Sequence, residues 1–346
     1  MIAPGPVLLD PLRARWEAML PQLKGTLPGS WGGELRKLSD RFNRIEGEPS
    51  GDYFTHANLE PYFAHHGWAQ AHALAAIMAE TPAAFEGVRR VWDLGGGPGV
   101  LTAAASTLMP DAIFDLSDLR PEVLAWAEAR LKPLGVQLNT KRQRLPILPD
   151  GTPDLVILGH VLNELHEWDQ LDLLEAVKAR LSPRGRILIL EPALQSTTRR
   201  LMELRDHLRE APYAILAPCP CADRCPMLAL TRQWCVAELP WNPPPWFRAL
   251  DAAAGLDRRA LSFAYLLAQK NGAVRTPIAR IVGVPKPQKG KIERWMCTPA
   301  GGERWEALSR HGDPDWALPR GEEVEVSTSG DLKPHAEGWP VRRFRS

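Results

Sequence analysis

Hydrophobic residues recur at helical spacing near the start of the chain. Between Pro11 and Leu23 apolar side chains return every three to four residues, and the segment Trp68–Ala79 is rich in alanine. This period is typical of helices that bury one face. Glycine and proline within residues 49–51 separate the two segments. We therefore predict a helical region over residues 1–85, which either caps a core domain or forms a platform for a substrate.

After this region the pattern changes to short apolar runs that alternate with helical segments. Continuous apolar runs are typical of strands that are buried on both faces of a parallel sheet, and their alternation with helices indicates a doubly wound α/β sheet. We expect strands at Val91–Leu94, Ala112–Leu116, Asp154–Leu158, Arg186–Leu190, Leu261–Ala268 and Ile278–Val284, and helices at Val100–Leu108, Pro121–Leu131 and Gln170–Leu181.

The last part of the chain differs again, because Pro, Gly and Trp are frequent there and strand-like pieces such as Glu322–Ser327 are short. This texture predicts a small β-rich extension. The expected domain organisation is thus a helical region (1–85), an α/β domain (86–275) and a C-terminal extension (276–346).

Charge and composition restrict the partners that the chain can have. Its 346 residues include 42 Lys and Arg against 41 Asp and Glu, for a formal net charge of +1. A balanced charge lacks the positive field of a typical nucleic-acid binder, so any RNA must be held by a local patch. No apolar stretch is long enough to span a membrane, and the first residues carry no secretory signal. We expect a cytoplasmic protein with neither a membrane nor DNA as partner.

The positions of the cysteines indicate a candidate metal site. Four of the five cysteines lie between Cys219 and Cys235, and the fifth is Cys297. An odd number in a reducing compartment argues against a disulfide framework. The thiols are either inert core residues or metal ligands, and thiolates in proline-restrained turns suit zinc and iron–sulfur clusters. The spacing without Cys221 lacks the paired Cys-x2-Cys of structural zinc and favours an iron–sulfur cluster, with zinc as the alternative.

A glycine-rich loop follows the first predicted strand. Residues 93–99 read Asp-Leu-Gly-Gly-Gly-Pro-Gly, and glycines in such a loop let a ligand approach the backbone closely. The Gly-Lys-Ser/Thr of a phosphate-binding P-loop is absent, and so is the glycine spacing of a dinucleotide fingerprint. The loop instead resembles motif I of the class I S-adenosylmethionine-dependent methyltransferases. This resemblance implies a Rossmann-like doubly wound sheet of that superfamily, with an N-terminal helical cap and a small C-terminal β-rich extension.

The same resemblance implies cofactor contacts beyond the loop. Asp118 stands just after the second predicted strand, where the superfamily keeps a carboxylate for the cofactor ribose, and His160 follows the fourth, at the methionine end. The acidic residue that many relatives offer the adenine is absent from residues 141–145. The implied S-adenosylmethionine-binding residues are Asp93, Gly95, Gly97, Gly99, Asp118 and His160.

Residues for methyl transfer itself are less evident. The Asn/Asp-Pro-Pro-aromatic and Pro-Cys motifs of base-methylating enzymes are absent from residues 159–165. His160 and Glu164 are the weak candidate bases in this segment. Cofactor binding is therefore better supported than catalysis, and the chain is a possible, not a certain, enzyme.

The cysteine pattern narrows the resemblance. Together with the glycine loop, it is similar to a methyltransferase-like family associated with assembly of the mitochondrial small ribosomal subunit, which also has bacterial members. The family resemblance implies a role on small-subunit rRNA. Cys221 stands where the family usually has His, and is an alternative ligand. The implied ligands of a 4Fe-4S cluster are Cys219, Cys225, Cys235 and Cys297.

A basic segment lies before Cys297. Residues 275–295 hold six Lys and Arg against one Glu, a local charge of +5. Basic side chains in a Pro- and Gly-containing loop beside a tryptophan suit phosphate contacts and base stacking; a solvated basic loop is the alternative. The candidate RNA-binding residues are Lys286, Lys289, Lys291 and Arg294.

Three functions follow from these features. The first is an S-adenosylmethionine-binding, iron–sulfur-containing protein that acts on small-subunit rRNA or in ribosome assembly. The second is a catalytically inactive RNA-binding assembly scaffold. The third is a small-molecule methyltransferase with a structural zinc.

Overall fold

The computed structural model describes residues 3–44, 54–210, 212–273, 279–289, 291–308, 319–326 and 341–343. The predicted helix break at 49–51 lies outside these residues. The chain divides into two compact units. One, here called the loop unit, comprises residues 2–190 and 240–261; the other, the cysteine unit, comprises residues 191–239 and 262–346 with Met1. The three-part division at residues 85 and 275 stays a prediction.

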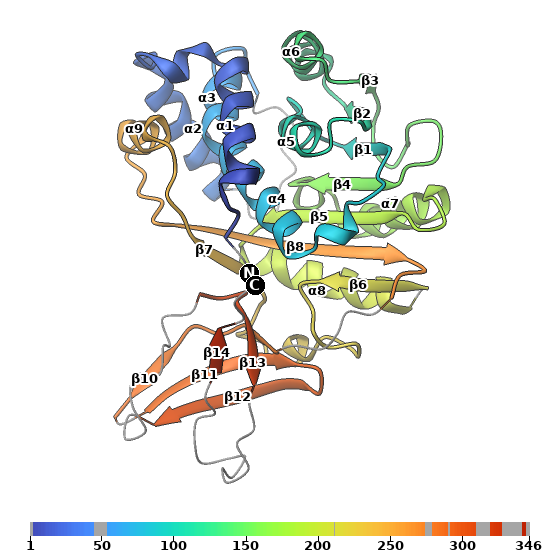
Figure 1. Cartoon of the computed structure of the whole chain (residues 1–346), viewed down its shortest axis with the longest axis vertical. Helices are drawn as coiled ribbons and strands as arrows, with labels where there is room; N and C mark the ends of the chain where they lie inside the picture. The colour runs from blue at the N-terminus through green and yellow to red at the C-terminus, as the bar shows by residue number, and fades with distance from the viewer. Residues whose placement is uncertain are drawn as a thin grey trace. The chain divides into compact units, whose positions relative to one another are not determined.

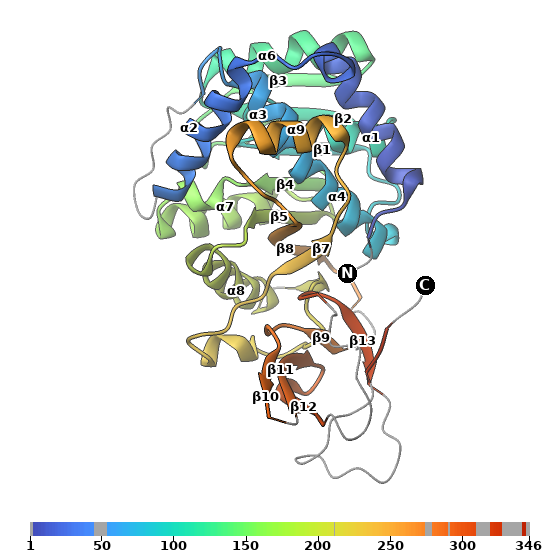
Figure 2. The ribbon, with the colours of Figure 1, turned by 90° about the vertical axis from the view of Figure 1, so that its left-hand side faces the viewer.

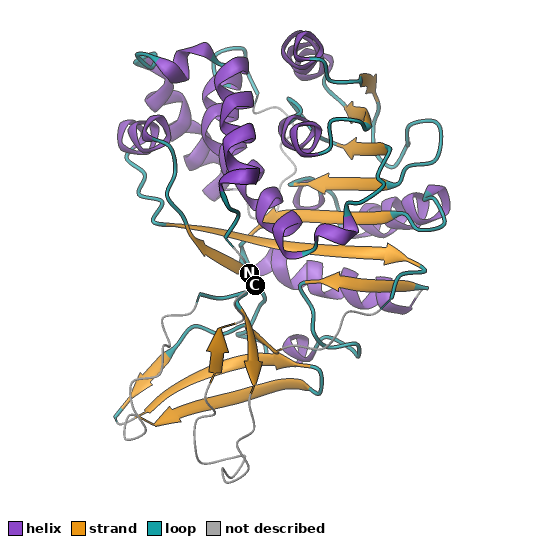
Figure 3. Cartoon of the chain, viewed as in Figure 1, coloured by secondary structure: helices purple, strands orange, loops and turns teal. Residues whose placement is uncertain are grey.

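Parallel strands form the centre of the loop unit (Figures 1 and 3). β1 pairs with β2 and β4, β2 with β3, and β4 with β5, each in parallel. Side chains such as Trp92 and Ile157 are fully buried, as expected for strands covered on both faces. The strands are β1 (Arg90–Leu94), β2 (Ile113–Asp118), β3 (Leu138–Arg142), β4 (Leu155–Gly159) and β5 (Arg186–Pro192).

The strand order confirms the predicted fold class. The larger sheet runs β3-β2-β1-β4-β5-β8-β6, with β7 paired to β8. β6 (Tyr213–Ala217) is antiparallel to β8 (Ala260–Lys270). A parallel sheet that ends in an antiparallel strand pair is the arrangement of the class I methyltransferase fold. The glycine loop follows β1, where the strand order reverses direction, which is where ligands bind in open α/β sheets.

Helices of the loop unit come from both ends of its sequence. The predicted helix Pro11–Leu23 instead spans Pro6–Met19, because Pro21 begins a separate short turn. Gly32 of α2 packs against α9, where a Cβ atom would lie 2.7 Å from the Ala253 carbonyl oxygen, and Figure 2 shows α9 beside the N-terminal helices. The helices are α1 (Pro6–Met19), η1 (Pro21–Lys24), α2 (Ser30–Arg44), α3 (Leu59–Tyr62), η2 (Phe63–Gly67), α4 (Trp68–Glu80), η3 (Pro82–Ala84), α5 (Val100–Leu108), α6 (Pro121–Leu131), η4 (Lys132–Leu134), η5 (Leu162–Glu164), α7 (Glu167–Arg180) and α9 (Pro245–Ala254).

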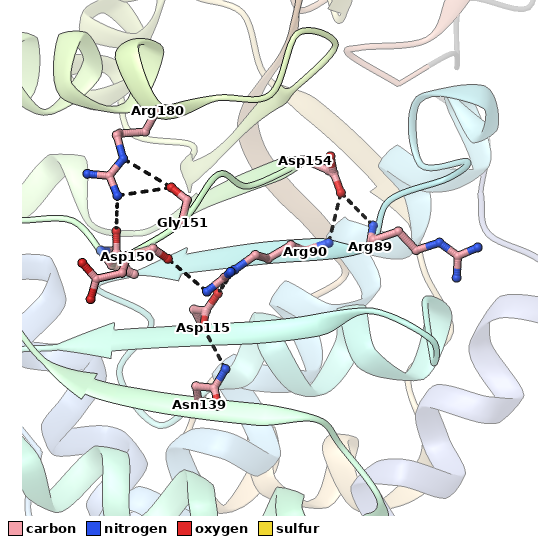
Figure 4. Close-up of polar contacts among 9 residues, drawn as sticks. Arg89, Arg90, Asp115, Asn139, Asp150, Gly151, Asp154 and Arg180 are labelled. Carbon is pink, nitrogen blue, oxygen red and sulfur yellow. Dashed lines mark hydrogen bonds and ion pairs between the residues drawn. The ribbon is translucent and has the colours of Figure 1, made fainter.

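Polar contacts fix the end of this sheet opposite the glycine loop (Figure 4). Arg90, the first residue of β1, donates from Nε to Asp115 Oδ2 at 2.6 Å, and Asn139 donates to Asp115 Oδ1 at 3.0 Å. Asp154 accepts the backbone N–H groups of Arg89 and Arg90. These bonds join β1, β2 and β3 at their starts and leave their carboxyl ends for the site.

The cysteine unit contains a second sheet, which is antiparallel. Its order is β10-β11-β9-β13-β14, with β12 paired to β11. The predicted strand Ile278–Val284 is therefore wrongly placed in the larger sheet: its central part, β9 (Ala279–Ile281), pairs with β11 and β13. The buried ion pair between Arg280 and Glu323 fixes this pairing. The elements are α8 (Gln195–Glu210), η6 (Pro226–Ala229), β7 (Ala237–Pro240), β10 (Lys286–Gln288), β11 (Lys291–Thr298), β12 (Gly301–Leu308), β13 (Glu323–Val326) and β14 (Val341–Arg343).

Among the described helices, none has the length and apolar character needed to cross a bilayer.

Candidate functional site

The glycine loop has a backbone that other residues would strain. Gly95, Gly97 and Gly99 have φ values of +67°, +54° and +74°, a region that favours glycine. A Cβ atom at Gly95 would lie 2.4 Å from Val161 Cγ2. Gly99 is the N-cap of α5, and a Cβ atom at this position would lie 3.2 Å from the Cβ of Ala127 in α6. The loop therefore needs glycine for its conformation and for its close approach to the β4 turn.

Asp93 lies inside the loop and holds the start of α5. Its Oδ2 accepts the backbone N–H of Thr102 at 3.0 Å and the Thr102 hydroxyl at 2.7 Å. Burial raises the pKa of Asp93 to about 6, against the lowering effect of these bonds, and the nearby Asp118 adds to the rise. Its other oxygen, Oδ1, has no hydrogen-bond partner among the described residues. One buried acceptor is thus left for a donor that the described part of the chain does not supply.

Asp118 supports the loop from the end of β2. Its Oδ2 accepts the Gly97 N–H at 2.9 Å, and its Oδ1 accepts both the backbone N–H of Arg120 at 2.9 Å and the Arg120 Nε–H at 3.3 Å. An ionised carboxylate has about four acceptor positions, so these bonds leave capacity for further donors such as ribose hydroxyls. The structure places Asp118 as the residue that joins the loop to the second strand.

A pocket opens at the loop, and it unites most of the predicted cofactor residues. Asp93, Gly95 and Gly97 line it from the β1 side, and His160 and Glu164 line it from the β4 side. Gly99 and Asp118 stabilise the loop behind it. Residues that the sequence did not single out also line the pocket: Phe54, Tyr62, Gln70 and Arg120.

These additional residues bring the N-terminal helices into the site. Gln70 donates to the Tyr62 hydroxyl at 3.1 Å, and the Arg120 guanidinium lies over the Phe54 ring at 4.7 Å. Burial raises the pKa of Tyr62 to about 12, so its phenol stays protonated at neutral pH. The helical region is therefore part of the pocket wall. The only sequence signal for Tyr62 was its rarity, as one of four tyrosines.

A polar network from α9 fixes the π-helical turn η2 next to the pocket. His65 is fully buried, stacks on Phe247 with ring centroids 4.4 Å apart, and bonds Asp251 Oδ1 at 2.6 Å through Nε2. Arg258 contacts His66 Nδ1 at 3.3 Å. Single π-helical turns are frequent at functional sites. Here the turn positions His66 in a stack with the ring of Tyr62, which lines the pocket.

The two candidate bases face the same pocket. His160 adopts a left-handed backbone conformation, with φ of +58°, and burial, followed by the positive charge of Arg258, lowers the pKa of its side chain to about 4. Its imidazole is therefore neutral at physiological pH and has a lone pair that can accept a proton. Glu164 supplies a carboxylate from the 3-10 turn η5. The pocket can thus present the neutral imidazole of His160 and the carboxyl group of Glu164 to a ligand.

The cysteine unit gathers its five thiols from separate elements. All five are free; Cys221, Cys225 and Cys297 are buried, and Cys219 and Cys235 are partly exposed. Cys297 lies in β11, opposite Gly302 of β12. Cys221, Cys225 and Cys297 share one apolar cluster, against which Cys235 packs. Cys219, Cys235 and Cys297 line a common cavity.

The pKa shifts of these thiols show that they are mutual neighbours. Burial, followed by the charge of Cys219, raises the pKa of Cys225 to about 11. Burial also raises the pKa of Cys235 and of Cys297, and in each case Cys219 and Cys225 add to the rise. The four predicted ligands therefore lie within each other's electrostatic reach. Across the described residues, however, no group of three or more His, Cys, Asp or Glu side chains is arranged to hold a metal ion.

The predicted RNA-binding residues fall into different environments. Lys286 and Lys289 belong to an exposed run that covers residues 284–289. Lys291 begins β11, and its side chain lies outside the described part. Arg294 is only 3% exposed and donates from Nε to the Gly283 carbonyl oxygen at 2.9 Å. Its guanidinium lies inside the small sheet, so among the candidates whose side chains the structure describes, Lys286 and Lys289 are the exposed ones.

Comparison with known proteins gives partial matches to methyltransferases. Rat (Rattus norvegicus) acetylserotonin O-methyltransferase is 27% identical over 189 residues, which are 51% of this chain and 42% of that protein. The mouse (Mus musculus) enzyme is 27% identical over 200 residues, 54% of this chain and 50% of its own. The chain thus spans half or less of the length of these curated relatives.

Solved structures of methyltransferases also match. NodS, an N-methyltransferase from Bradyrhizobium japonicum WM9 in complex with S-adenosyl-L-homocysteine, is 13% identical, with 61% of this chain and 91% of that chain covered and a TM-score of 0.41.

One family model covers most of the chain. The model of the mitochondrial small ribosomal subunit protein Rsm22 matches residues 60–314, from the N-terminal helices to the end of the described part of β12 and beyond. This match includes the glycine loop, both candidate bases and all five cysteines. The chain therefore belongs to the Rsm22 family.

Proposed function

We propose that this chain binds S-adenosylmethionine at the glycine loop and acts on the rRNA, or in the assembly, of the small ribosomal subunit. The observation that carries this proposal is the pocket formed by the loop and the β4 turn in a member of the Rsm22 family. The family's name supplies the ribosomal partner, and the loop supplies the ligand site.

The residues of the pocket fit the proposed cofactor. Added Cβ atoms at Gly95 and Gly96 would collide with Val161, Leu116 and Asp93, so only glycine lets the loop backbone lie this close to the β4 turn and to β2 at the edge of the pocket. The unpartnered Oδ1 of Asp93 and the spare acceptor capacity of Asp118 suit the donors of an aminoacyl and a ribose group. Gly95, Gly97 and Asp93 would hold the cofactor, Asp118 would bind its ribose, and His160 would line its methionine end.

When bound, the cofactor supplies an electrophilic methyl group, and the chain has to present and deprotonate an acceptor. Glu164 and the neutral His160 line the pocket and would take that proton. The surrounding aromatic rings of Phe54 and Tyr62 exclude water from this side. We propose His160 and Glu164 as the residues on which methyl transfer depends.

We further propose that Cys219, Cys225, Cys235 and Cys297 bind a 4Fe-4S cluster, with zinc as the alternative. The donor set fits in residue type: Cys225, Cys235 and Cys297 belong to one cluster of side chains, and Cys219, Cys235 and Cys297 line a single cavity. Cysteine thiolates are the usual ligands of iron–sulfur clusters. A reducing, cytoplasmic location would keep these thiols available as ligands. Such a cluster would stabilise the junction between the cysteine segment and β11.

The proposed RNA surface rests on Lys286 and Lys289 in β10 and the turn after it. Their side chains are exposed, and exposed lysines contact phosphates independently of sequence. We propose that this surface contacts the rRNA backbone.

The function is tested by incubating the anaerobically purified chain with methyl-labelled S-adenosylmethionine and immature small subunits. Label in small-subunit rRNA that is lost in Glu164→Gln is the expected result. Subunit binding without any label would instead identify the inactive scaffold, and the lack of subunit binding together with one bound zinc would favour a small-molecule methyltransferase. Asp172→Asn, a change on an outward-facing part of α7, is the matched control.

A further inference from the structure

Arg205 and Arg320 lie outside residues 219–235, here called the cysteine segment, but their side chains contact it. The proposed set of cysteine ligands does not account for these contacts. Arg205 comes from α8 and is 2% exposed. Arg320 precedes β13 and is partly buried. Buried guanidinium groups are costly unless they are paired and hydrogen-bonded. Their partners therefore indicate what these two residues do.

Arg205 clamps the loop that carries Cys219 to Cys225. It donates to the carbonyl oxygens of Cys221 and Asp223. Its neighbour Asp206 accepts the Cys225 N–H at 2.9 Å and the Arg205 guanidinium at 2.6 Å. Burial alone would lower the pKa of Arg205, but the charges of Cys219 and Asp206 raise it. The guanidinium thus binds the loop backbone and faces the Cys219 sulfur.

Arg320 does the same for the second cysteine-bearing segment. It donates to the Trp234 carbonyl oxygen at 2.7 Å and to the Val282 carbonyl oxygen at 2.9 Å, and it lies over the Trp234 ring at 5.3 Å. Glu238 pairs with it at 3.6 Å. Its charge lowers the pKa of the adjacent Cys235, whose pKa burial raises. Arg320 therefore joins Trp234, the residue before Cys235, to Val282, the residue after β9 of the small sheet.

We propose that Arg205 and Arg320 are positioning residues of the cysteine site: each binds backbone carbonyl oxygens of a segment that carries proposed ligands and sets a positive charge near one ligand thiolate, Cys219 for Arg205 and Cys235 for Arg320. This inference rests on the proposed cluster. Charged groups around the site include these two arginines, their partners Asp206 and Glu238, the Arg280–Glu323 pair, and Arg199 and Arg294. Removal of either guanidinium leaves its acidic partner beside the thiolates without compensation.

The chain contains a matched control on the same helix. Arg199 of α8 also clamps this segment, with donors to the carbonyl oxygens of Leu228, Leu230 and Gln233. It holds backbone in the same way, between Cys225 and Cys235, but its partners are not next to a cysteine. Arg199→Gln therefore removes a clamp and a charge without removing a cation that faces a proposed ligand.

The test uses the anaerobically purified full chain and two measurements, bound iron per chain and the reduction potential from a dithionite titration followed by absorbance. We expect Arg205→Gln and Arg320→Gln to disfavour one-electron reduction at least tenfold, a downward shift of about 59 mV for a one-electron couple, because less positive charge remains near the cluster. Arg205→Lys and Arg320→Lys retain the charge and should recover most of the potential. Arg199→Gln should leave it unchanged.

Each outcome decides one of the two ideas. Wild type without iron would refute the proposed cluster, and this inference with it. Iron at the wild-type level with an unchanged potential in both glutamine variants would refute the positioning role alone. Loss of iron in the glutamine variants supports the role if the lysine variants and Arg199→Gln retain iron, and refutes it if Arg199→Gln loses iron equally. Far-UV circular dichroism identifies any variant that fails to fold.

Discussion

The glycine loop and the cysteine site are built in different ways. The loop consists of consecutive residues, and its shape follows from three glycines with positive φ. The cysteine site gathers thiols from the segment after β6 and from β11, which are more than sixty residues apart in sequence. Backbone conformation forms the first site, whereas side chains from distant elements form the second. A change of one residue should therefore act locally in the loop and more widely in the cysteine unit.

The two sites also differ in how their ionisable groups affect one another. The pocket at the loop keeps one buried carboxylate, Asp93, within its own hydrogen bonds to Thr102. The cysteine site places several thiols within mutual reach, and their pKa values rise through burial and through one another. Four such groups cannot all ionise without a cation. Hydrogen bonds from the chain itself thus hold Asp93, with one carboxylate oxygen left over, while the thiols need positive charge to act as thiolates.

The largest effect is expected from a proposed cluster ligand. Cys225→Ser should abolish the iron–sulfur absorbance, because serine does not replace a thiolate ligand of iron. Cys221→Ser should retain it, since Cys221 is the cysteine outside the proposed ligand set. The measurement is iron content and visible absorbance after anaerobic purification. Equal loss in both variants would show that Cys221 belongs to the ligand set.

The next largest effect should come from the loop. Gly95→Ala adds a Cβ 2.4 Å from Val161 Cγ2 at a φ of +67°, so we expect cofactor affinity to fall by about tenfold to a hundredfold, or roughly 1.4 to 2.7 kcal/mol. Gly87→Ala is the control, because Gly87 has a φ of +69° with no atom near its Cβ position. It should lose stability with unchanged affinity. Calorimetric titration with S-adenosylmethionine measures the affinity of both variants, and thermal unfolding measures their stability; equal affinities for the two variants would contradict the role of Gly95.

A smaller effect should appear in the pH dependence of stability. The folded pKa of Asp93 lies at about 6, above that of an unfolded aspartate, so the folded state binds more protons between these values. Asp93 therefore lowers the free energy of unfolding as pH rises from about 4 to 6, by roughly 2 to 3 kcal/mol. Asp93→Asn should gain stability relative to wild type over this window, as measured by urea unfolding.

This comparison is made as a difference between variant and wild type, because other groups titrate in the same range. The buried His72 has a pKa lowered to about 4, which acts in the opposite direction: protonation of the unfolded histidine reduces stability as pH falls. A stability difference between the two proteins that does not change from pH 4 to pH 7 would contradict the shifted pKa of Asp93.

The smallest effect is expected at the exposed lysines. Lys286→Ala and Lys289→Ala should each weaken binding to a small-subunit rRNA fragment by a few fold and reduce the slope of log affinity against log salt by about one. Lys132→Ala, which removes an exposed lysine paired with Glu128 in the other unit, should leave both unchanged. A filter-binding series in salt measures the slopes, and an unaltered slope in both lysine variants would exclude contact with phosphates.

Local sequence patterns predicted the elements that lie next to the loop. The bounds expected for Val100–Leu108 and Pro121–Leu131 agree with α5 and α6, because glycine, proline and helix period mark both ends. The strand Ile278–Val284 was correctly expected in part but assigned to the wrong sheet, because an apolar run does not tell which partner it pairs with. Side-chain burial was equally hidden, as Arg294 shows.

The sequence by itself determined the α/β fold class, the glycine loop and the residue types of the cysteine site, because these depend on consecutive residues and on chemistry. Only the tertiary structure brought Tyr62 and Gln70 to the pocket, and only it placed Arg205 and Arg320 against the cysteine segments. These side chains have no local pattern, since their contacts join elements that are far apart in the chain. The glycine loop could therefore be predicted from consecutive residues, whereas the surroundings of the cysteines could not.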